Sequence, residues 1–471
     1  MKSSIRYSGL LQIAIAASFT IFSTLQPATA AQTKTALDEY VTAPDSAYQY
    51  ELIRSIPGKG FKGHILDMTS QRWLTKKEVD RTLWQHWIRI IEPDQVEHDT
   101  ALLFIGGGAN GREAPKTIDE QLAKVAMATK SVVAELGMVP NQPLIFHGDG
   151  VKRTEDNLIA YGWDQYLRTG EAKWLARLPM TKSAVRAMDT ISDFLSTDQP
   201  DASKVNQYVV AGGSKRGWTT WTTGAVDSRV KAIIPIVIDL LNVVPSFKHH
   251  YRAYGFFAPA VGDYEAAGIM DWQETQAYQN LLKIVEPYEY RERFTMPKLL
   301  LNATGDQFFV PDSLQFYWNE LPGPKHVRYV PNSEHSMRET DAMESLIAYY
   351  HGILNETPLP EFTWKINKNN AIIVTPQDKP AKALLWQAHN PEARDFRVDT
   401  IGRSWKSREL KLTKKGRFIG KIKQPENGFS AYFVELIYST GAPTPFKATT
   451  QVKVIPDKYP FDAYQPKSIK R

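Results

Sequence analysis

The feature of this sequence that most constrains its fold is a series of short apolar runs separated by segments with helical spacing. The runs fall at residues 101–105, 144–146, 208–210, 233–238 and 299–301, and an alternating one covers 326–330. Strands that are apolar at every position are typical of parallel sheets covered on both faces, with helices connecting one strand to the next. The pattern therefore predicts an α/β fold with a mostly parallel sheet, preceded by strand-like segments at 47–93.

A different pattern begins near residue 361. Helical spacing ends there, and short strand-like segments recur at 371–374, 383–386, 409–412, 418–422, 431–438 and 447–454. Such segments separated by turn residues are typical of a small β-sandwich of the immunoglobulin or fibronectin kind. The charge follows the same division, because residues 361–471 contain 21 basic and 10 acidic side chains, whereas residues 31–360 contain 34 basic and 41 acidic ones. We therefore expect an acidic α/β body at 31–360 and a basic β domain at 361–471.

The first 30 residues have the pattern of a secretory signal peptide. Lys2 and Arg6 precede an apolar stretch at 9–22, and the sequence ATA at 28–30 matches a small-x-small cleavage site. We expect cleavage after Ala30 and a periplasmic or secreted mature protein, with an uncleaved membrane anchor as the alternative. No later stretch approaches the roughly 18 apolar residues that a membrane-spanning helix needs, so no further transmembrane segment is predicted.

Cysteine is absent from the chain. Its absence excludes disulfides, a thiol nucleophile and thiolate metal sites. Any covalent catalysis must therefore use another nucleophile.

Three polar residues that could form a catalytic triad each follow a predicted strand of their own. Ser214 lies in the glycine-rich turn 212–217 (GGSKRG), Asp306 follows the run at 299–301, and His335 follows the strand at 326–330. A serine hydroxyl becomes nucleophilic when a histidine takes its proton, and a carboxylate fixes the tautomer of that histidine. The chain order Ser, Asp, His is that of the α/β-hydrolase triad. The sequence therefore predicts a serine hydrolase with Ser214 as nucleophile.

Two alternatives to this assignment stay open. The usual elbow is G-x-S-x-G, but here position 216 is arginine and the second glycine comes one residue later, at Gly217. An ordinary glycine-rich turn and a solvated loop histidine would give the same residues. Asp239, at the end of the run 233–238, is the rival acid, and Asp312 is less favoured because it is expected to begin a helix.

A second glycine-rich turn, Gly106-Gly107-Gly108, follows the run at 101–105. Hydrolases place one backbone N–H donor of the oxyanion hole at this position, and the residue after the nucleophile supplies the other. No histidine precedes the glycines, so the match to the HGGG motif is partial, and a plain flexible turn is the alternative. We expect the oxyanion hole to comprise Lys215 and this turn.

Four strings of residues carry a resemblance to one family. They are GSKRGWTTW at 213–221, GAVD at 224–227, EDNLIAY at 155–161 and LPMTK at 178–182. The chain resembles the PhoPQ-activated pathogenicity-related protein family, exported proteins with an α/β-hydrolase body, over most of 35–360 and into the β tail. The resemblance implies control by a system that senses magnesium and antimicrobial peptides, with a role in virulence or in resistance to cationic peptides.

The turn at 212–217 is also similar to the G-C-S-R-x-G elbow of glucuronoyl esterases. In that family the basic residue after the nucleophile helps to hold the oxyanion, which implies the same role for Lys215. Gly213 stands where that pattern has cysteine.

An insertion rich in aromatic residues separates the runs at 233–238 and 299–301. Its aromatic residues are Phe247, Tyr251, Tyr254, Phe256, Phe257, Tyr264, Trp272 and Tyr278. Insertions at this point often form a cap over the site, so we expect a helical cap at about 240–296, with packing inside an added helical layer as the alternative. Aromatic walls suit sugars, peptides and acyl chains alike.

Candidate substrate contacts are Trp272 in this insertion, Arg216 in the elbow, and His147 and Asp149 after the run at 144–146. The expected substrate is a small molecule, a glycan or a peptide. No His-x-x-His pair or carboxylate cluster has the spacing of metal ligands, so neither a metal nor another cofactor is predicted. No basic-aromatic module for nucleic acid is visible, and the basic C-terminal domain favours contact with an anionic envelope surface.

Two functions are consistent with these residues. The first is an exported serine hydrolase that cleaves an ester or a peptide bond. The second is a catalytically weak hydrolase-fold protein that acts as a secreted binding or signalling factor, because a fold alone does not establish activity.

Overall fold

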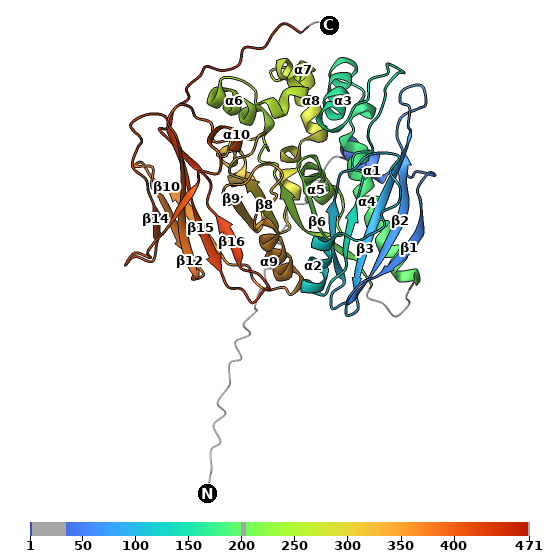
Figure 1. Ribbon diagram of the computed structural model, residues 1–471, viewed down its shortest axis with the longest axis horizontal. Helices are drawn as coiled ribbons and strands as arrows, with labels where there is room; N and C mark the ends of the chain where they lie inside the picture. The colour runs from blue at the N-terminus through green and yellow to red at the C-terminus, as the bar shows by residue number, and fades with distance from the viewer. Residues whose placement is uncertain (2–33, 199–203, 470–471) are drawn as a thin grey trace. The chain divides into compact units, whose positions relative to one another are not determined.

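A nine-stranded sheet forms the centre of this computed structural model (Figure 1). The strand order is β1-β2-β3-β5-β4-β6-β7-β8-β9. Neighbours from β5 to β9 pair in parallel, whereas β1, β2 and β3 form an antiparallel meander that joins β5. The strands are β1 (Gln49–Pro57), β2 (Phe61–Arg72), β3 (Leu83–Pro93), β4 (Thr100–Ile105), β5 (Val133–Leu136), β6 (Gln207–Gly213), β7 (Val230–Ile236), β8 (Lys298–Ala303) and β9 (Lys325–Val330). The predicted mostly parallel sheet is confirmed.

The structure describes Met1, residues 34–198 and residues 204–469. The elements below all belong to the unit Thr35–Arg471. Apart from Met1, the predicted signal peptide at 1–30 lies outside the described residues. Within the described part of the chain, no helix is long and apolar enough to cross a membrane.

One predicted strand of the sheet is wrong. Residues 144–146 are buried in part, but they make only isolated bridges, Leu144 with Arg153 and Phe146 with Val79, and the Ile145 N–H donates to the Asp80 carboxylate. The sheet strand that the sequence analysis did not predict is β5, which follows shortly after helix α2. Helix α2 (Glu120–Thr129) ends at Lys130, which adopts a left-handed backbone with φ 48°, so the chain is free to enter the sheet at β5.

Helices cover both faces of the sheet, since its strands alternate between two hydrophobic clusters. Val210 and Ile233 belong to the cluster that contains residues of α3, α4 and α5, whereas their chain neighbours Val209 and Ile234 belong to the cluster with α2 and α9. The remaining helices of the body are α1 (Ala36–Thr42), α3 (Glu155–Thr169), η1 (Ala172–Trp174), α4 (Arg177–Asp198), α5 (Lys215–Val226), η5 (Ser313–Phe316), η6 (Trp318–Glu320) and α9 (Ala342–Leu354). This alternation explains why the parallel strands are apolar at every position.

The predicted helical cap is confirmed between β7 and β8. It consists of α6 (Val243–Tyr254), η2 (Pro259–Val261), α7 (Gly262–Ala266), η3 (Ile269–Trp272), α8 (Gln276–Val285) and η4 (Pro287–Arg293). In Figure 1, α6, α7 and α8 lie together at one end of the central strands, next to α3. The cap is therefore placed over the edge of the sheet where the parallel strands end.

Two antiparallel sheets follow the body, as predicted. The first has the order β10-β11-β14 and the second β13-β12-β15-β16, with β17 paired to β15. Their elements are β10 (Phe362–Ile366), β11 (Ile372–Pro376), β12 (Lys382–Asn390), α10 (Val398–Ile401), β13 (Lys406–Glu409), β14 (Phe418–Gly420), β15 (Phe429–Tyr438), β16 (Phe446–Thr449) and β17 (Lys453–Ile455). Buried Val374 and Val434 share one apolar cluster between the sheets. The β region also contacts the body directly, because the Tyr329 N–H on β9 donates to Thr449 Oγ1 at 3.0 Å.

Candidate active site

Ser214 occupies a strained turn between β6 and α5. Its backbone angles are φ 57° and ψ −125°, and its N–H donates to the Ile236 carbonyl at 2.9 Å. Such a conformation costs a non-glycine residue about 1–3 kcal/mol and persists only where the surroundings hold it. Helix α5 begins at the next residue, so Ser214 lies at the positive end of the helix dipole.

The unusual glycine spacing of this turn has a steric explanation. A Cβ atom on Gly212 would lie 2.8 Å from the Arg216 carbonyl oxygen, and one on Gly217 would lie 2.8 Å from the Ile236 carbonyl oxygen. These two glycines therefore let α5 pack closely against β6 and β7. Glycine is needed at 217 rather than at 216 because position 217 is the one that faces β7.

Asp306 and His335 meet at the ends of β8 and β9. His335 Nδ1 lies 2.9 Å from both carboxylate oxygens of Asp306, which is 4% exposed. The backbone N–H of Phe308 donates to the same carboxylate at 2.8 Å, and the backbone N–H of His335 donates to Gln307 Oε1 at 3.0 Å. These contacts fix the ring so that the second nitrogen, Nε2, is left to act on another group.

His335 Nε2 is buried and has no hydrogen-bond partner among the described residues. No hydrogen bond between Ser214 and His335 is present in that part of the chain either. Catalytic hydrogen bonds of this kind are often long before substrate binds. The structure thus joins two members of the predicted triad, and the link to Ser214 stays a prediction.

The rival acids Asp239 and Asp312 are engaged elsewhere. The hydroxyls of Tyr317 and Tyr329 donate to Asp239 at 2.5 and 2.6 Å. Burial raises the pKa of Asp239, and the negative charges of nearby carboxylates raise it further. The two hydrogen bonds lower the pKa but do not outweigh burial, so the pKa is about 7. Asp312 is paired with His249 at 2.8 Å and with Arg394 at 2.6 Å. Neither carboxylate contacts His335.

The predicted oxyanion donors are not equivalent. The Gly106 N–H already donates to the Leu136 carbonyl at 2.8 Å, so it is not available to a substrate oxygen. Within the described residues, the N–H groups of Gly107, Gly108 and Lys215 have no acceptor. The prediction therefore narrows to Lys215 with Gly107 or Gly108.

A network of charged side chains surrounds the elbow. Lys215 Nζ lies 2.7 Å from Asp156 and 3.0 Å from Glu155, and the guanidinium of Arg216 binds Glu155 through two hydrogen bonds of 2.9 and 2.7 Å. Burial alone would raise the pKa of Glu155, but its hydrogen bonds with Arg216 and the charges of Arg216 and Lys215 outweigh burial and lower that pKa to about 2. The Lys215 ammonium is thus held by two carboxylates of α3.

The network also fixes the turn after β4. A Cβ atom on Gly107 would lie 2.6 Å from a terminal nitrogen of Arg216, so the glycine leaves room for the guanidinium. Arg177, 4% exposed, donates to the Lys215 carbonyl at 2.9 Å and lies over the ring of Trp218. Both glycine-rich turns of the candidate site are therefore held by arginine side chains.

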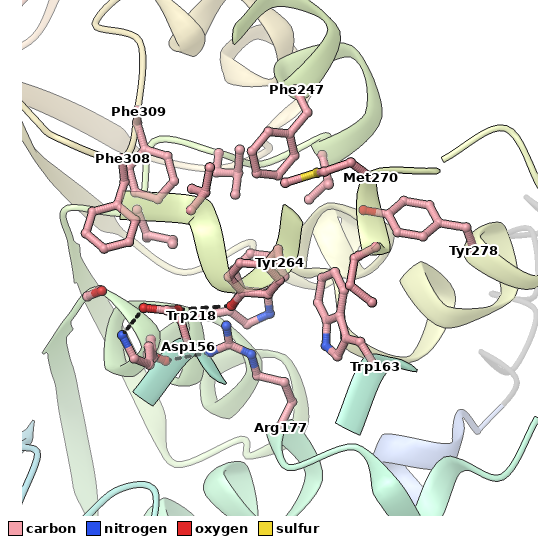
Figure 2. A pocket seen from close by; sticks show the side chains of 17 residues that line it. Asp156, Trp163, Arg177, Trp218, Phe247, Tyr264, Met270, Tyr278, Phe308 and Phe309 are labelled. Carbon is pink, nitrogen blue, oxygen red and sulfur yellow. Dashed lines mark hydrogen bonds and ion pairs between the residues drawn. The ribbon is translucent and has the colours of Figure 1, made fainter. Parts of the chain in front are cut away.

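A partly enclosed pocket opens beside Ser214, and Figure 2 shows it from close by. Its residues from the body include Asp156, Arg177, Lys215, Trp218, Phe308 and Phe309. In Figure 2, Phe308 and Phe309 lie at one end of the pocket and Trp163 and Tyr278 at the other. The cap supplies the opposite wall, so the predicted position of the cap over the site agrees with the pocket.

None of the four predicted substrate contacts lines this pocket. Arg216 is bound to Glu155, and Trp272 packs against the core of the cap. His147 lies against Trp174, and Asp149 forms an ion pair with Arg153. The last two residues are displaced because the run that precedes them is not a strand of the sheet.

Sequence reasoning missed two groups of residues at this site. Phe308, whose ring centre lies 4.2 Å from that of His335, follows Asp306 in the loop after β8. Asp156 and Glu155 occur in a string that resembles the family, but no role was assigned to them. The available signal was charge complementarity, because two adjacent acids match the two adjacent bases Lys215 and Arg216.

The strand order, the strained serine turn after β6 and the acid–histidine pair after β8 and β9 together define an α/β-hydrolase fold. The chain belongs to the PhoPQ-activated pathogenicity-related protein family, whose model matches residues 37–397. The predicted family resemblance is confirmed.

Several known proteins are similar to this chain. Autocrine proliferation repressor protein A of Dictyostelium discoideum is 37% identical over 456 residues, which cover 91% of this chain and 92% of that protein. Among solved structures, the acetyl xylan esterase from Paenibacillus sp. R4 is 14% identical with a TM-score of 0.48, covering 69% of this chain and 96% of that one. The glucuronoyl esterase from Solibacter usitatus is 13% identical with a TM-score of 0.37, covering 68% and 90%.

Proposed function

We propose that the protein is a serine hydrolase that cleaves an ester or a peptide bond with Ser214, His335 and Asp306. The observation that carries the proposal is the pairing of His335 with Asp306 at the same edge of the sheet as the strained Ser214 turn. A buried carboxylate on one ring nitrogen, with the other nitrogen unpartnered among the described residues, is what a histidine needs to act as a general base.

The reaction follows from these positions. His335 Nε2 takes the proton as Ser214 Oγ attacks the carbonyl carbon, and Asp306 stabilises the imidazolium that forms. The N–H of Lys215 and one N–H of the Gly107–Gly108 turn bind the developing oxyanion. His335 then gives the proton to the leaving group, and water releases the acyl group from Ser214 by the reverse sequence.

Turnover of a substrate panel tests this proposal. We expect Ser214→Ala to abolish hydrolysis of p-nitrophenyl esters or of aminoacyl-p-nitroanilides, whichever the wild type cleaves. Ser336→Ala is the matched control, because Ser336 is an exposed serine next to His335. Equal activity of Ser214→Ala and wild type would exclude Ser214 as the nucleophile.

The second candidate function is that of a secreted signalling or binding factor without turnover. Two observations favour it: the relative from Dictyostelium discoideum is named as a proliferation repressor, and Ser214 is not hydrogen-bonded to His335 in the described residues. The Ser214→Ala protein separates the two functions. If it retains a growth-repressing effect or a protective effect against cationic peptides, these effects do not depend on hydrolysis.

Export and envelope contact are further parts of the proposal. The N-terminal 30 residues support export, and N-terminal sequencing of the secreted protein tests cleavage after Ala30.

Eight basic residues between 406 and 423 are exposed around β13 and β14, against one acid, Glu409. We expect the protein to bind vesicles that contain anionic lipid more tightly than neutral ones, in a salt-dependent way. Equal binding to both vesicles would contradict a role for this surface.

A further inference from the structure

The pocket beside Ser214 is mainly apolar. Thirteen of its 17 lining residues are hydrophobic or aromatic. Those from the cap are the half-buried Tyr264 and the buried Val243, Phe247, Val261, Ile269, Met270 and Tyr278. Figure 2 shows Phe247 and Met270 across the pocket from Trp218 and Arg177. A group that enters this space exchanges water for apolar contacts on both sides.

The polar residues of the pocket are already paired with one another. Asp156 accepts hydrogen bonds from Lys215 Nζ at 2.7 Å and from the Tyr264 hydroxyl at 3.0 Å. Arg177 is held by the Lys215 carbonyl and by Trp218. A sugar in this pocket would lose its hydration without recovering enough hydrogen bonds, which is costly. An apolar group would gain about 25 cal/mol for each Å² that it removes from water.

The position of His335 shows which side of the scissile bond the pocket serves. His335 does not line the pocket, and Phe308, which does, packs against its ring with the centres 4.2 Å apart. The leaving group must receive its proton from His335, so it departs on the side of that histidine. The pocket is therefore left to the acyl group, which stays attached to Ser214 until water releases it.

We propose that the preferred substrates are esters with an apolar acyl group of several carbons, and that the cap forms the acyl-binding wall. This inference rests on the proposed function of Ser214. In the step concerned, Ser214 Oγ forms a bond to the acyl carbon while the bond from that carbon to the alcohol oxygen breaks. The serine proton passes through His335 to the departing alcohol, and the acyl chain remains in the pocket.

A chain-length series measures this preference. With p-nitrophenyl acetate, butyrate, hexanoate and octanoate, we expect kcat/KM to rise by about fourfold per added methylene until the pocket is filled. Val261→Phe narrows the pocket from the cap and should lower the ratio of hexanoate to acetate kcat/KM by about tenfold. Ala266→Trp adds a larger ring to the exposed side of α7 in the same cap and should leave the ratio unchanged.

Each outcome can be assigned. A kcat/KM that stays flat or falls beyond acetate, in a protein whose Ser214 reacts with a fluorophosphonate, overturns the acyl-pocket inference and leaves the proposed function intact. Failure of Ser214 to react at all counts against the proposed function instead. If Val261→Phe does not fold, Met270→Phe narrows the same pocket from η3, and an unchanged ratio in that folded variant also overturns the inference.

Discussion

At the scale of single residues, the site depends on which carboxylate faces the histidine. Asp306 and Asp239 both follow strands of the parallel sheet, at neighbouring positions in the strand order. Only Asp306 contacts His335, whereas Asp239 is enclosed by two tyrosine hydroxyls. The two residues therefore have separable roles that two matched substitutions can distinguish.

Asp306→Asn should lower kcat by about 10³–10⁴-fold, because the amide cannot hold the histidine in the productive tautomer or stabilise its charged form. Asp239→Asn should reduce kcat far less, since Asp239 does not contact the histidine. Steady-state kinetics on the preferred ester, with circular dichroism to confirm folding, would check this difference. Equal losses in the two variants would contradict the assignment of the acid.

Asp239 also predicts a pH dependence of stability. Its folded-state pKa of about 7 lies above its ordinary value of 3.8. The stabilisation of the folded state by protonated Asp239 is therefore complete below pH 3.8 and is lost as the pH rises to 7. Over this range the free energy of unfolding falls by at most about 1.4 kcal/mol per pH unit. Asp239→Asn removes this titrating group. Between pH 5 and 7 the free energy of unfolding of the variant should therefore rise relative to that of wild type. Urea denaturation at several pH values measures the gain, and parallel curves would refute the pKa shift.

At the scale of elements, the cap is held in place by the last described segment of the chain. The Tyr464 hydroxyl donates to Asp271 on η3 at 2.7 Å, and the Lys467 N–H donates to the same oxygen at 2.7 Å. The ring of Tyr464 also contacts Tyr251 and Phe257 of the cap region, with ring centres 5.1 and 5.0 Å apart. The C-terminal segment therefore supports the element that carries Ile269 and Met270 into the pocket.

Tyr464→Ala should loosen this support and destabilise the protein by about 1–3 kcal/mol, with increased protease cleavage in the cap. Tyr464→Phe is the control, because it keeps the ring contacts and loses only the hydrogen bond, for a cost of about 1 kcal/mol. Chemical denaturation with limited proteolysis would test both variants. A Tyr464→Ala protein that is as stable and as resistant to protease as wild type would show that Tyr464 does not support the cap.

At the scale of the whole molecule, the order of the chemistry along the chain was predictable because each part of it is local. A glycine-rich turn after an apolar run, an aspartate after another and a histidine after a third are visible without any knowledge of contacts. The exception is the sheet strand at 133–136. With four residues, this strand is too short for the spacing of its apolar residues to distinguish it from the preceding helix. Because the run at 144–146 is predicted as a strand in place of β5, His147 and Asp149 are wrongly predicted to contact the substrate in the candidate site.

The ion-pair network was not predictable in the same way. It joins Glu155 and Asp156 to Lys215 and Arg216, about sixty residues apart, and only the fold brings α3 to the start of α5. The shape of the pocket depends on the same long-range packing, because its two walls come from the body and from the cap. The sequence could therefore indicate a serine hydrolase, but it could not indicate the size or polarity of the acyl group that the pocket accepts.

The reaction of Ser214 with a fluorophosphonate is the most direct test of the central claim, that this serine is activated by the Asp306–His335 pair. Intact-mass and peptide mass spectrometry of the labelled, folded protein should find one adduct on Ser214, absent in Ser214→Ala and formed far more slowly in His335→Ala. An unlabelled wild-type protein, or an adduct on Ser214 that forms equally fast without His335, would contradict the account.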